Sequence, residues 1–215
     1  MDKIDQSAKS KIVRNPNRSH YDKATLYKVL DAGFLCHVSY LFNGAPVIIP
    51  TAYARVDNMI YLHGALKNRM MICLLEQGQA SIAVTHLDGM VLARSAFHHS
   101  FNYRSAVVFG TPVKVENAEE KEFVLKMITE NILPDRWQEV RPPSEKELAT
   151  TLVIGIEIEE ASVKTRSGAP IDDDADYDLP IWAGELPLKQ GYDQPISDSR
   201  LSQGIVIPES VKKSL

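Results

Sequence analysis

Cysteine is scarce in this 215-residue sequence, and the scarcity narrows the chemistry that the chain can carry. The two cysteines, Cys36 and Cys73, lie in apolar segments, so we expect two free thiols in a reducing compartment. No CxxC pair occurs, which leaves a structural zinc site or a thioredoxin-type redox site without its ligands.

Long apolar runs and basic runs are also missing. No stretch approaches the ~18 continuous apolar residues of a membrane span. The polar N-terminal stretch 1–21 lacks the apolar segment of a signal peptide, so we expect a cytoplasmic protein with no membrane partner. The formal net charge is −4 and no basic run is present, which predicts no nucleic-acid partner.

Several nucleotide-binding and hydrolytic signatures are absent. The sequence contains no GxGxxG, GxxxxGK[ST], HExxH or GxSxG, so a Rossmann site, a P-loop, a zincin and an α/β-hydrolase lack their motifs. The Asp-rich stretch 172–178 lacks the spacing of a calcium-binding EF-hand loop, and we expect it to be a solvated loop.

What is present is a succession of short β-type segments. Residues 34–41, 47–56 and 59–63 are apolar or β-branched, and Asn43-Gly44 between the first two is a strong hairpin signal. Strands that follow one another through tight turns predict an antiparallel barrel or sandwich and disfavour a βαβ sheet.

Capping residues and apolar spacing define the remaining elements. Helices are predicted over 22–33, 67–77, 117–133 and from Ser144 onward. Further strands are predicted over 79–85, as two strands within 90–115, and over 152–160, with Asp88-Gly89 as a turn.

The composition changes after about Ser167. Five of the twelve prolines follow that point, which excludes one continuous helix or sheet. Trp182 would be unusual in a disordered tail, so we expect this arm to dock on the barrel or on a partner subunit. We therefore divide the chain into a domain with an N-terminal lead-in at 1–168 and an arm at 169–215.

The first candidate site is the segment 61–69, where a strand ends at Gly64 and a helix opens with Lys67 and Arg69. Acidic residues normally occupy the first turn of a helix, because the helix dipole is positive there. Two cations at this end indicate either a solvated pair of charges or a phosphate bound to the free backbone amides.

The second candidate site is the segment 97–105, Phe-His-His-Ser-Phe-Asn-Tyr-Arg-Ser, just before an apolar strand. In an extended chain His98 and His99 point to opposite faces, so they are poor joint ligands for one metal ion, and we predict no metal site. One interpretation of the segment is a polar pocket that binds the ring system of a ligand. The other is a strand end whose polar side chains form hydrogen bonds within the protein.

The third candidate site surrounds Pro50, which indicates an edge strand or a bulge. Thr51 and Tyr53 would share one face of this strand. Both side chains could then hydrogen-bond a ligand.

Together these segments resemble the pyridoxamine 5′-phosphate oxidase-like, FMN-binding split-barrel superfamily. The nearest branch is the flavin-nucleotide-binding proteins related to nitroimidazole-resistance reductases. The resemblance is carried by Arg14-x-Pro16-x-Arg18-x-x-Tyr21-Asp22, Tyr61-Leu62-His63-Gly64-Ala65, His98-His99-Ser100-x-Asn102-Tyr103-Arg104-Ser105, Lys164-Thr165-Arg166-Ser167-Gly168 and Leu179-Pro180-x-Trp182-Ala183-Gly184.

The resemblance implies a mainly β fold, a six-stranded antiparallel split β-barrel with flanking helices. It also implies a homodimer with FMN, or alternatively FAD, in each of two clefts between the subunits. The cofactor-binding residues that it implies are Thr51, Tyr53, Leu62, His63, Gly64, Lys67, Asn68, Arg69, His99, Ser100, Ser105 and Trp182, with His63 also as the catalytic candidate.

In function, the resemblance implies a flavin-dependent oxidoreductase acting on a small molecule, with NAD(P)H as a candidate electron donor. The alternative is a non-catalytic protein that stores or senses flavin or haem, with His98 or His99 as the haem candidates. The oxidase branch has a basic C-terminal segment that binds pyridoxal phosphate. This chain has proline and aspartate there, which disfavours pyridoxamine phosphate as the substrate.

Overall fold

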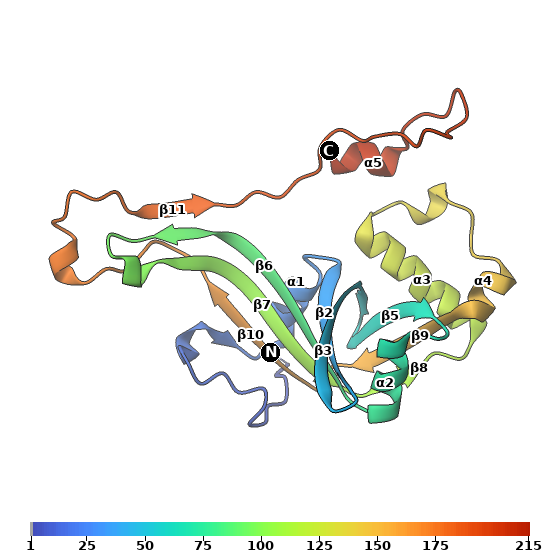
Figure 1. Cartoon of the computed structure of the whole chain (residues 1–215), viewed down its shortest axis with the longest axis horizontal. Helices are drawn as coiled ribbons and strands as arrows, with labels where there is room; N and C mark the ends of the chain where they lie inside the picture. Colours follow the sequence, from blue (N-terminus) through green and yellow to red (C-terminus); the bar gives the residue numbers. More distant parts are fainter. Residues whose placement is uncertain (1) are drawn as a thin grey trace.

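The computed structural model describes residues 2–215 and shows two antiparallel sheets flanked by helices (Figure 1). The strands are β1 Ser19–His20, β2 Leu35–Phe42, β3 Ala45–Ala52, β4 Ala54–Val56, β5 Met59–Ala65, β6 Ala80–Leu92, β7 Ser100–Gly110, β8 Pro112–Lys114, β9 Thr151–Glu157, β10 Glu160–Arg166 and β11 Gly184–Pro187. The α-helices are α1 Lys23–Leu30, α2 Arg69–Gln77, α3 Ala118–Ile132, α4 Glu145–Thr150 and α5 Glu209–Ser214, and short 3-10 turns are η1 Pro16–Arg18, η2 Ala96–His98, η3 Trp137–Glu139 and η4 Asp174–Asp176.

The seven-stranded sheet has the order β1-β10-β7-β6-β2-β3, with β11 added beside β6, and the four-stranded sheet has the order β4-β5-β9-β8. This mainly β architecture with flanking helices confirms the predicted split-barrel class. The expected count of six strands is wrong, because short strands such as β4 and β8 and the arm strand β11 add to it.

The core lies between the two sheets and under α1. Leu26, Val29 and Leu30 of α1 are buried against the inner face of the larger sheet. The Asp22 side chain accepts a hydrogen bond from Thr25 N at 2.8 Å, which confirms the predicted cap of this helix. The helix ends at Leu30 with Asp31 as its C-cap, earlier than the predicted end at Gly33.

Two features of the strands differ from the sequence prediction. The predicted turn at Asp88-Gly89 is wrong, because β6 continues through it with a bulge between Leu87 and Gly89. The return strand predicted over 47–56 breaks at Tyr53 into β3 and β4, and this break carries the chain from one sheet into the other.

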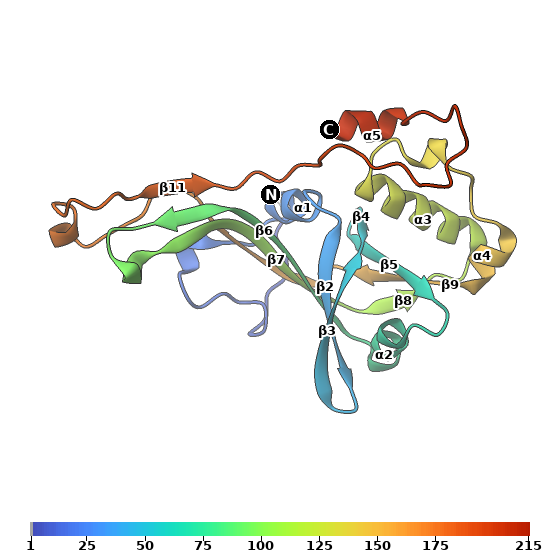
Figure 2. The same cartoon turned by 45° about the horizontal axis from the view of Figure 1, so that its top comes forward.

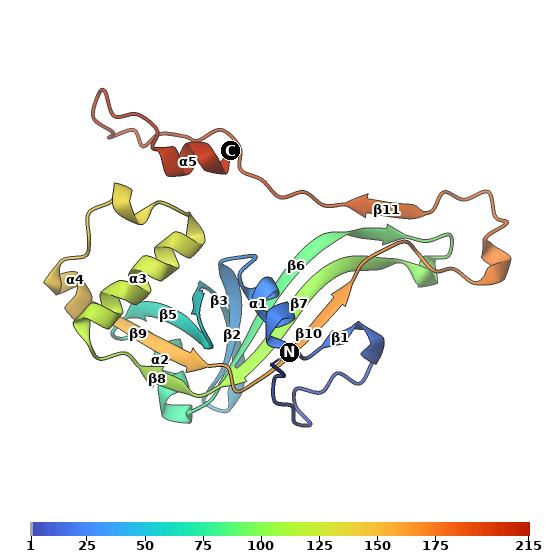
Figure 3. The ribbon, with the colours of Figure 1, turned by 180° about the vertical axis from the view of Figure 1, so that it is seen from behind.

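β6 and β7 extend beyond the body as a long hairpin, and the C-terminal arm follows it (Figures 1 and 3). β11 pairs with β6 from Gly184 opposite Leu92 to Pro187 opposite Gly89. Figure 2 shows the arm then crossing to α5, which lies beside α3.

Polar contacts hold α5 in place. Ser210 N donates to Glu139 at 3.1 Å, and Lys213 Nζ lies 2.6 Å from Asp135. The arm thus contacts its own chain through β11 and α5. Within residues 2–215, no helix is long and apolar enough to cross a membrane.

Candidate functional site

The N-terminus of α2 is the first part of the candidate site. Asn68 caps the helix, because its side-chain oxygen accepts a hydrogen bond from Met71 N at 3.2 Å. Arg69 is therefore the first helical residue, and Lys67 lies exposed before the cap. The expectation that the helix starts at Lys67 is wrong by two residues, since the asparagine provides the capping oxygen.

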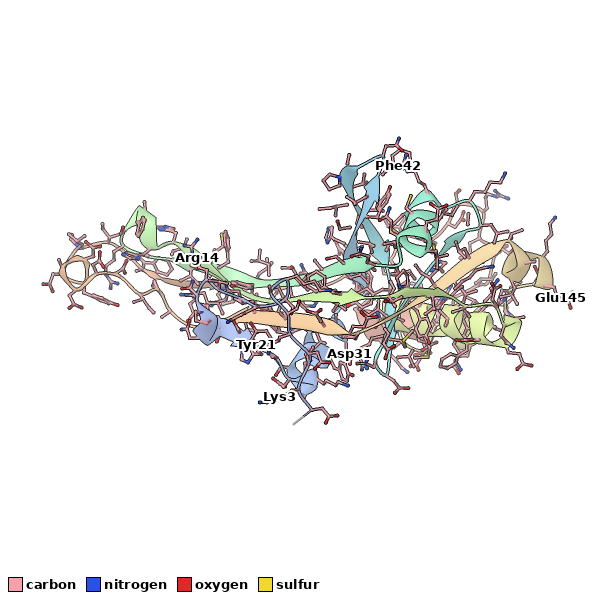
Figure 4. The ribbon with its side chains drawn as sticks, turned by 90° about the horizontal axis from the view of Figure 1, so that it is seen from below. Lys3, Arg14, Tyr21, Asp31, Phe42 and Glu145 are labelled. Atoms are coloured by element: carbon pink, nitrogen blue, oxygen red, sulfur yellow. The ribbon has the colours of Figure 1, made fainter. Side chains whose placement is uncertain are left out.

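Two cations stand at this helix end without acidic partners. The Arg69 guanidinium lies 4.4 Å from the centroid of the Phe42 ring, and its Nε donates to the Tyr40 hydroxyl at 3.3 Å. Figure 4 shows Phe42 at the end of β2, next to α2. Within residues 2–215, neither Arg69 nor Lys67 has a carboxylate within 4.0 Å. Because the dipole at this end is also positive, the arrangement favours an anion.

Gly64 allows the helix to approach the strand. A Cβ at this position would lie 2.8 Å from Asn68 Nδ2 and 2.9 Å from Met71 Sδ. A larger residue would therefore displace the side chains of Asn68, the capping residue, and Met71. The glycine keeps the cap and the first-turn amides close to the strand.

His63 lies one residue earlier, in β5 opposite Val153 of β9. Its Nδ1 is buried and has no hydrogen-bond partner among the described residues. Burial lowers the pKa of the His63 imidazole below its ordinary value, so the ring is neutral at pH 7. A neutral ring can accept a hydrogen bond or a proton, but it is a poor proton donor.

Two residues predicted to line a ligand have side chains in the core. Tyr53 is fully buried, and its hydroxyl donates to the Leu30 carbonyl. Leu62 is also fully buried, so only its backbone can face a ligand. Tyr53 lies where the chain crosses from one sheet into the other, between β3 and β4. Thr51 stays half-buried in the edge strand β3.

The hairpin carries the second part of the candidate site, and there the polar residues are paired with one another. Arg166 is buried and donates to the Asn102 side-chain oxygen and to the carbonyls of Gly168 and Ala169, the latter two at 2.8 and 2.9 Å. Asn102 in turn donates to Glu185 Oε2 at 2.6 Å. These contacts fasten the arm to the hairpin.

The remaining predicted residues of this part lie along the same hairpin. His98 Nε2 is 3.4 Å from Asp173 Oδ2, and His99 Nδ1 is 2.9 Å from the Ser95 carbonyl oxygen. Ser105 donates to the Lys164 carbonyl at 3.3 Å. Trp182 on the arm is 68% exposed. Ser100 is half-buried at the start of β7.

The structure thus brings the residues from Leu62 to Arg69 together, and separately gathers the residues of the hairpin. Figure 1 shows the hairpin projecting away from the part of the body that holds α2. Sequence reasoning missed Tyr40, Phe42 and Arg166. Their roles depend on contacts between distant segments that no local pattern reveals.

A groove of about 590 Å³ lies elsewhere on the described chain. It is lined by residues 39–41, 77–81 and 109–111 with Lys9 and Glu159. None of the predicted site residues lines it. The groove lies at the C-terminal end of α2, and Tyr40, whose hydroxyl accepts a hydrogen bond from Arg69, is one of its lining residues.

Comparison with known proteins gives a family and two close structural matches. A family model described as pyridoxamine 5′-phosphate oxidase matches residues 22–165. The chain is 33% identical to the flavocytochrome Anf3 from Azotobacter vinelandii, with 97% of each chain covered and a TM-score of 0.90. It is 34% identical to the FAD and haem binding protein from Mycobacterium smegmatis, with 92% of this chain and 97% of that chain covered and a TM-score of 0.86.

A more distant match shows the fold alone. A Bacteroides thetaiotaomicron protein named for 5-nitroimidazole antibiotic resistance is 19% identical, over 68% of this chain and 85% of that chain, with a TM-score of 0.58. No functionally curated protein matches the sequence.

Proposed function

This chain belongs to the pyridoxamine 5′-phosphate oxidase family, and from that premise we propose that it binds a flavin nucleotide with the phosphate at the N-terminus of α2. The observation that carries the proposal is the pair of cations there, Lys67 and Arg69, with no carboxylate in reach within residues 2–215. The first-turn amides, the capping residue Asn68 and the close approach at Gly64 fit a phosphate group.

A homodimer completes the site in this proposal. The residues predicted to contact the ring, such as His99 and Ser105, belong to the hairpin and not to the body that holds Arg69. A second copy would supply them, and large apolar side chains stand uncovered on both parts. Ile48 of β3 is 63% exposed, and Phe97 on the hairpin is 88% exposed.

FAD is the flavin that the relatives support. One relative with 34% identity over 92% of this chain is named for FAD and haem, and the other is a flavocytochrome. We therefore replace FMN by FAD as the expected cofactor. The flavin would supply the electron transfer, and this chain would bind and orient it.

Haem is the second group in the proposal, with His99 as its ligand. In the neutral ring Nδ1 donates to the Ser95 carbonyl, which leaves the lone pair of Nε2 free for a metal. The uncovered rings of Phe97 and Phe101 provide an apolar surface beside it. His98 lies within reach of Asp173 instead and is the weaker candidate.

An oxidoreductase fits these groups better than a storage protein, with electrons passing between the flavin and a small molecule. The His63 imidazole is neutral beside the phosphate site, so its unprotonated ring nitrogen can accept a proton there. Pyridoxamine phosphate is not the proposed substrate, because the arm carries Asp172 to Asp178 where that substrate would need cations.

The absorption spectrum of the purified full-length protein, before and after incubation with FAD and haem, tests the proposal. We expect flavin bands and a haem Soret band, with the Soret band lost in His99→Ala and kept in His98→Ala. A protein that takes up neither FAD nor FMN would refute the flavin assignment. A Soret band that persists in His99→Ala would refute the haem ligand.

A further inference from the structure

The C-terminal arm is attached to its own chain at two places and is exposed between them. At one end β11 pairs with β6, and the Leu188 amide donates to the Asp88 carbonyl at 2.9 Å. At the other end the Ser210 amide of α5 donates to Glu139 at 3.1 Å. We call the residues between these attachments, 188–207, the strap. Figures 1 and 3 show the strap running from the hairpin to α5.

The strap is almost entirely exposed to solvent and is rich in large apolar side chains. Every residue in it is exposed except Pro195, which is half-buried. Ile196 is 97% exposed and Val206 is 76% exposed. Exposed apolar side chains scattered singly need no explanation, but their concentration on one segment is typical of an interaction site. The exposed large apolar residues of the strap are Leu188, Tyr192, Ile196, Leu201, Ile205, Val206 and Ile207.

The second half of the strap also forms a groove with α5 and the residues after α3. This strap groove measures about 400 Å³, and Arg136 and Glu139 line part of it. Its apolar lining consists of Ile196, Leu201, Ile205, Val206, Ile207 and Val211. The strap thus offers both projecting apolar side chains and a depression that can receive such side chains from a partner.

The charges of the strap indicate which kind of partner it fits. Lys189 and Arg200 are balanced by Asp193 and Asp198, so the strap has no net formal charge. It therefore lacks the excess of cations that attracts a protein to an anionic membrane surface or to nucleic acid. Interspersed charges of both signs suit a protein surface of mixed charge, such as that of a second copy of this chain.

A second copy has an uncovered apolar surface of its own on the larger sheet. Val38 of β2 points into the core, where it packs with residues of α1 and α2. Successive residues of a strand point to opposite faces, so Leu35 and Leu41 lie on the outer face, and both are exposed. Ile48 of β3 pairs with Ser39 on the same outer face and is exposed as well.

The outer face also carries a residue of the proposed flavin site. Ser39 pairs with Ser81 of β6, and Ser81 pairs with Phe109 of β7. Ser105 lies four positions before Phe109 in the same strand and therefore points to the same face. Because the proposed function requires Ser105 of a second copy to reach the flavin, the outer face must lie against that copy.

We propose that the strap packs across a second copy of this chain, and that the strap of the second copy packs across the first by two-fold symmetry. The inference rests on the proposed function for the presence of two copies, and it adds the segment that holds them together. A standard interface takes roughly 20–30 residues from each partner, and the strap with the outer face supplies about that number. Because both ends of the strap are already attached, it loses less conformational freedom on binding than a free tail would.

Sedimentation equilibrium of the full-length protein tests the proposal. The double variant Ile196→Ser with Val206→Ser removes the two most exposed apolar side chains of the strap, and it should leave the fold of each chain unchanged because both are exposed. We expect the dissociation constant of the dimer to rise by about tenfold or more. Val13→Ser is the matched control, since Val13 is an 82% exposed apolar residue outside the strap, and it should leave the dissociation constant unchanged.

Four results would overturn the proposal. They are a wild type that stays monomeric, a dimer of equal affinity in the strap variant and the wild type, an equal weakening by Val13→Ser, and binding to phosphatidylglycerol vesicles that only the strap variant loses while its dimer is unchanged. The last result would assign the strap to a lipid surface.

The visible absorption of the same samples after incubation with FAD keeps the flavin proposal separate. Flavin uptake by a dimer whose affinity does not depend on the strap would contradict the strap alone. A dimer that depends on the strap and takes up no flavin would contradict the flavin proposal alone.

Discussion

The N-terminus of α2 and the β6–β7 hairpin with its neighbour β10 both present arginine, but their surroundings differ. Arg69 on α2 contacts an aromatic ring and one hydroxyl. Arg166 at the end of β10 is buried among side-chain and backbone acceptors, and Arg104 of β7 pairs with Asp88 of β6 at 2.8 Å. An arginine whose acceptors belong to its own chain fastens the fold, whereas one without them is available to a ligand.

The largest effect on folding free energy should come from a substitution at Gly110, the last residue of β7, where the hairpin joins the body. A Cβ there would lie 1.7 Å from the Glu157 carbonyl oxygen, and backbone cannot move aside easily. Gly110→Ala should cost about 4 kcal/mol of folding free energy or more, measured by urea unfolding. Gly191→Ala, with no atom within 4 Å of the new Cβ, is the control. Equal stability of the two variants would show that the joint is not constrained.

The contrast between the two arginines should itself be measurable. Arg166→Ala leaves the Asn102 oxygen and the Gly168 carbonyl without their donor, and we expect a loss of about 3 kcal/mol. Arg69→Ala should cost about 1 kcal/mol or less, since it removes one contact with an aromatic face. Denaturant midpoints for both variants test this order, and a reversed order would contradict the assigned roles.

Unfolding measured over a pH series tests whether the His63 imidazole is desolvated in the folded protein. The unfolded imidazole titrates near 6.5, and burial lowers the folded pKa below that value. As pH falls below 6.5, the unfolded state binds more protons than the folded state, so the free energy of unfolding should decrease. Above pH 6.5 the imidazole is neutral in both states, and this loss should be absent. Unfolding of the wild type between pH 7.5 and 5 should show this slope, with a weaker slope in His63→Gln. Identical slopes would mean that the imidazole is not desolvated.

The smallest effect on folding should come from the arm at Trp182. Because its ring is 68% exposed, Trp182→Ala should change the unfolding free energy by about 0.5 kcal/mol or less. Self-association should weaken if a second copy covers this ring. Sedimentation at several protein concentrations measures both forms, and an unchanged dissociation constant would place Trp182 outside the interface.

Local signals in the sequence predicted the caps at Asp22, Asn117 and Ser144 and the first hairpin correctly. Ser144 and Glu147 form the expected capping box, and Asn43-Gly44 is the expected turn, with positive φ at both residues. These features depend only on residues near one another in the chain. The helix end predicted at Gly33 was three residues too late. The turn predicted at Asp88-Gly89 was wrong because β6 pairs there with both β7 and the arm strand β11, and these partners are distant in the sequence.

The candidate site was predictable to a similar extent. Lys67 and Arg69 were found because a strand, a glycine and two cations at a helix start follow one another in the sequence, whereas the capping role of Asn68 was not predicted. The polar hairpin residues were also singled out, but their pairing was not foreseen. Asn102, Arg166 and Glu185 are separated by 64 and 83 positions in two of their contacts, so only the fold reveals that they fasten the arm.

A fluorescence titration of FAD into the full-length protein tests the central claim most directly, with Arg69→Ala and Lys28→Ala compared to the wild type. The flavin phosphate at α2 predicts that Arg69→Ala weakens FAD binding by about tenfold or more, while Lys28→Ala binds as the wild type does. Equal affinity in all three proteins would contradict the account, because the cations at the N-terminus of α2 would then not hold the nucleotide.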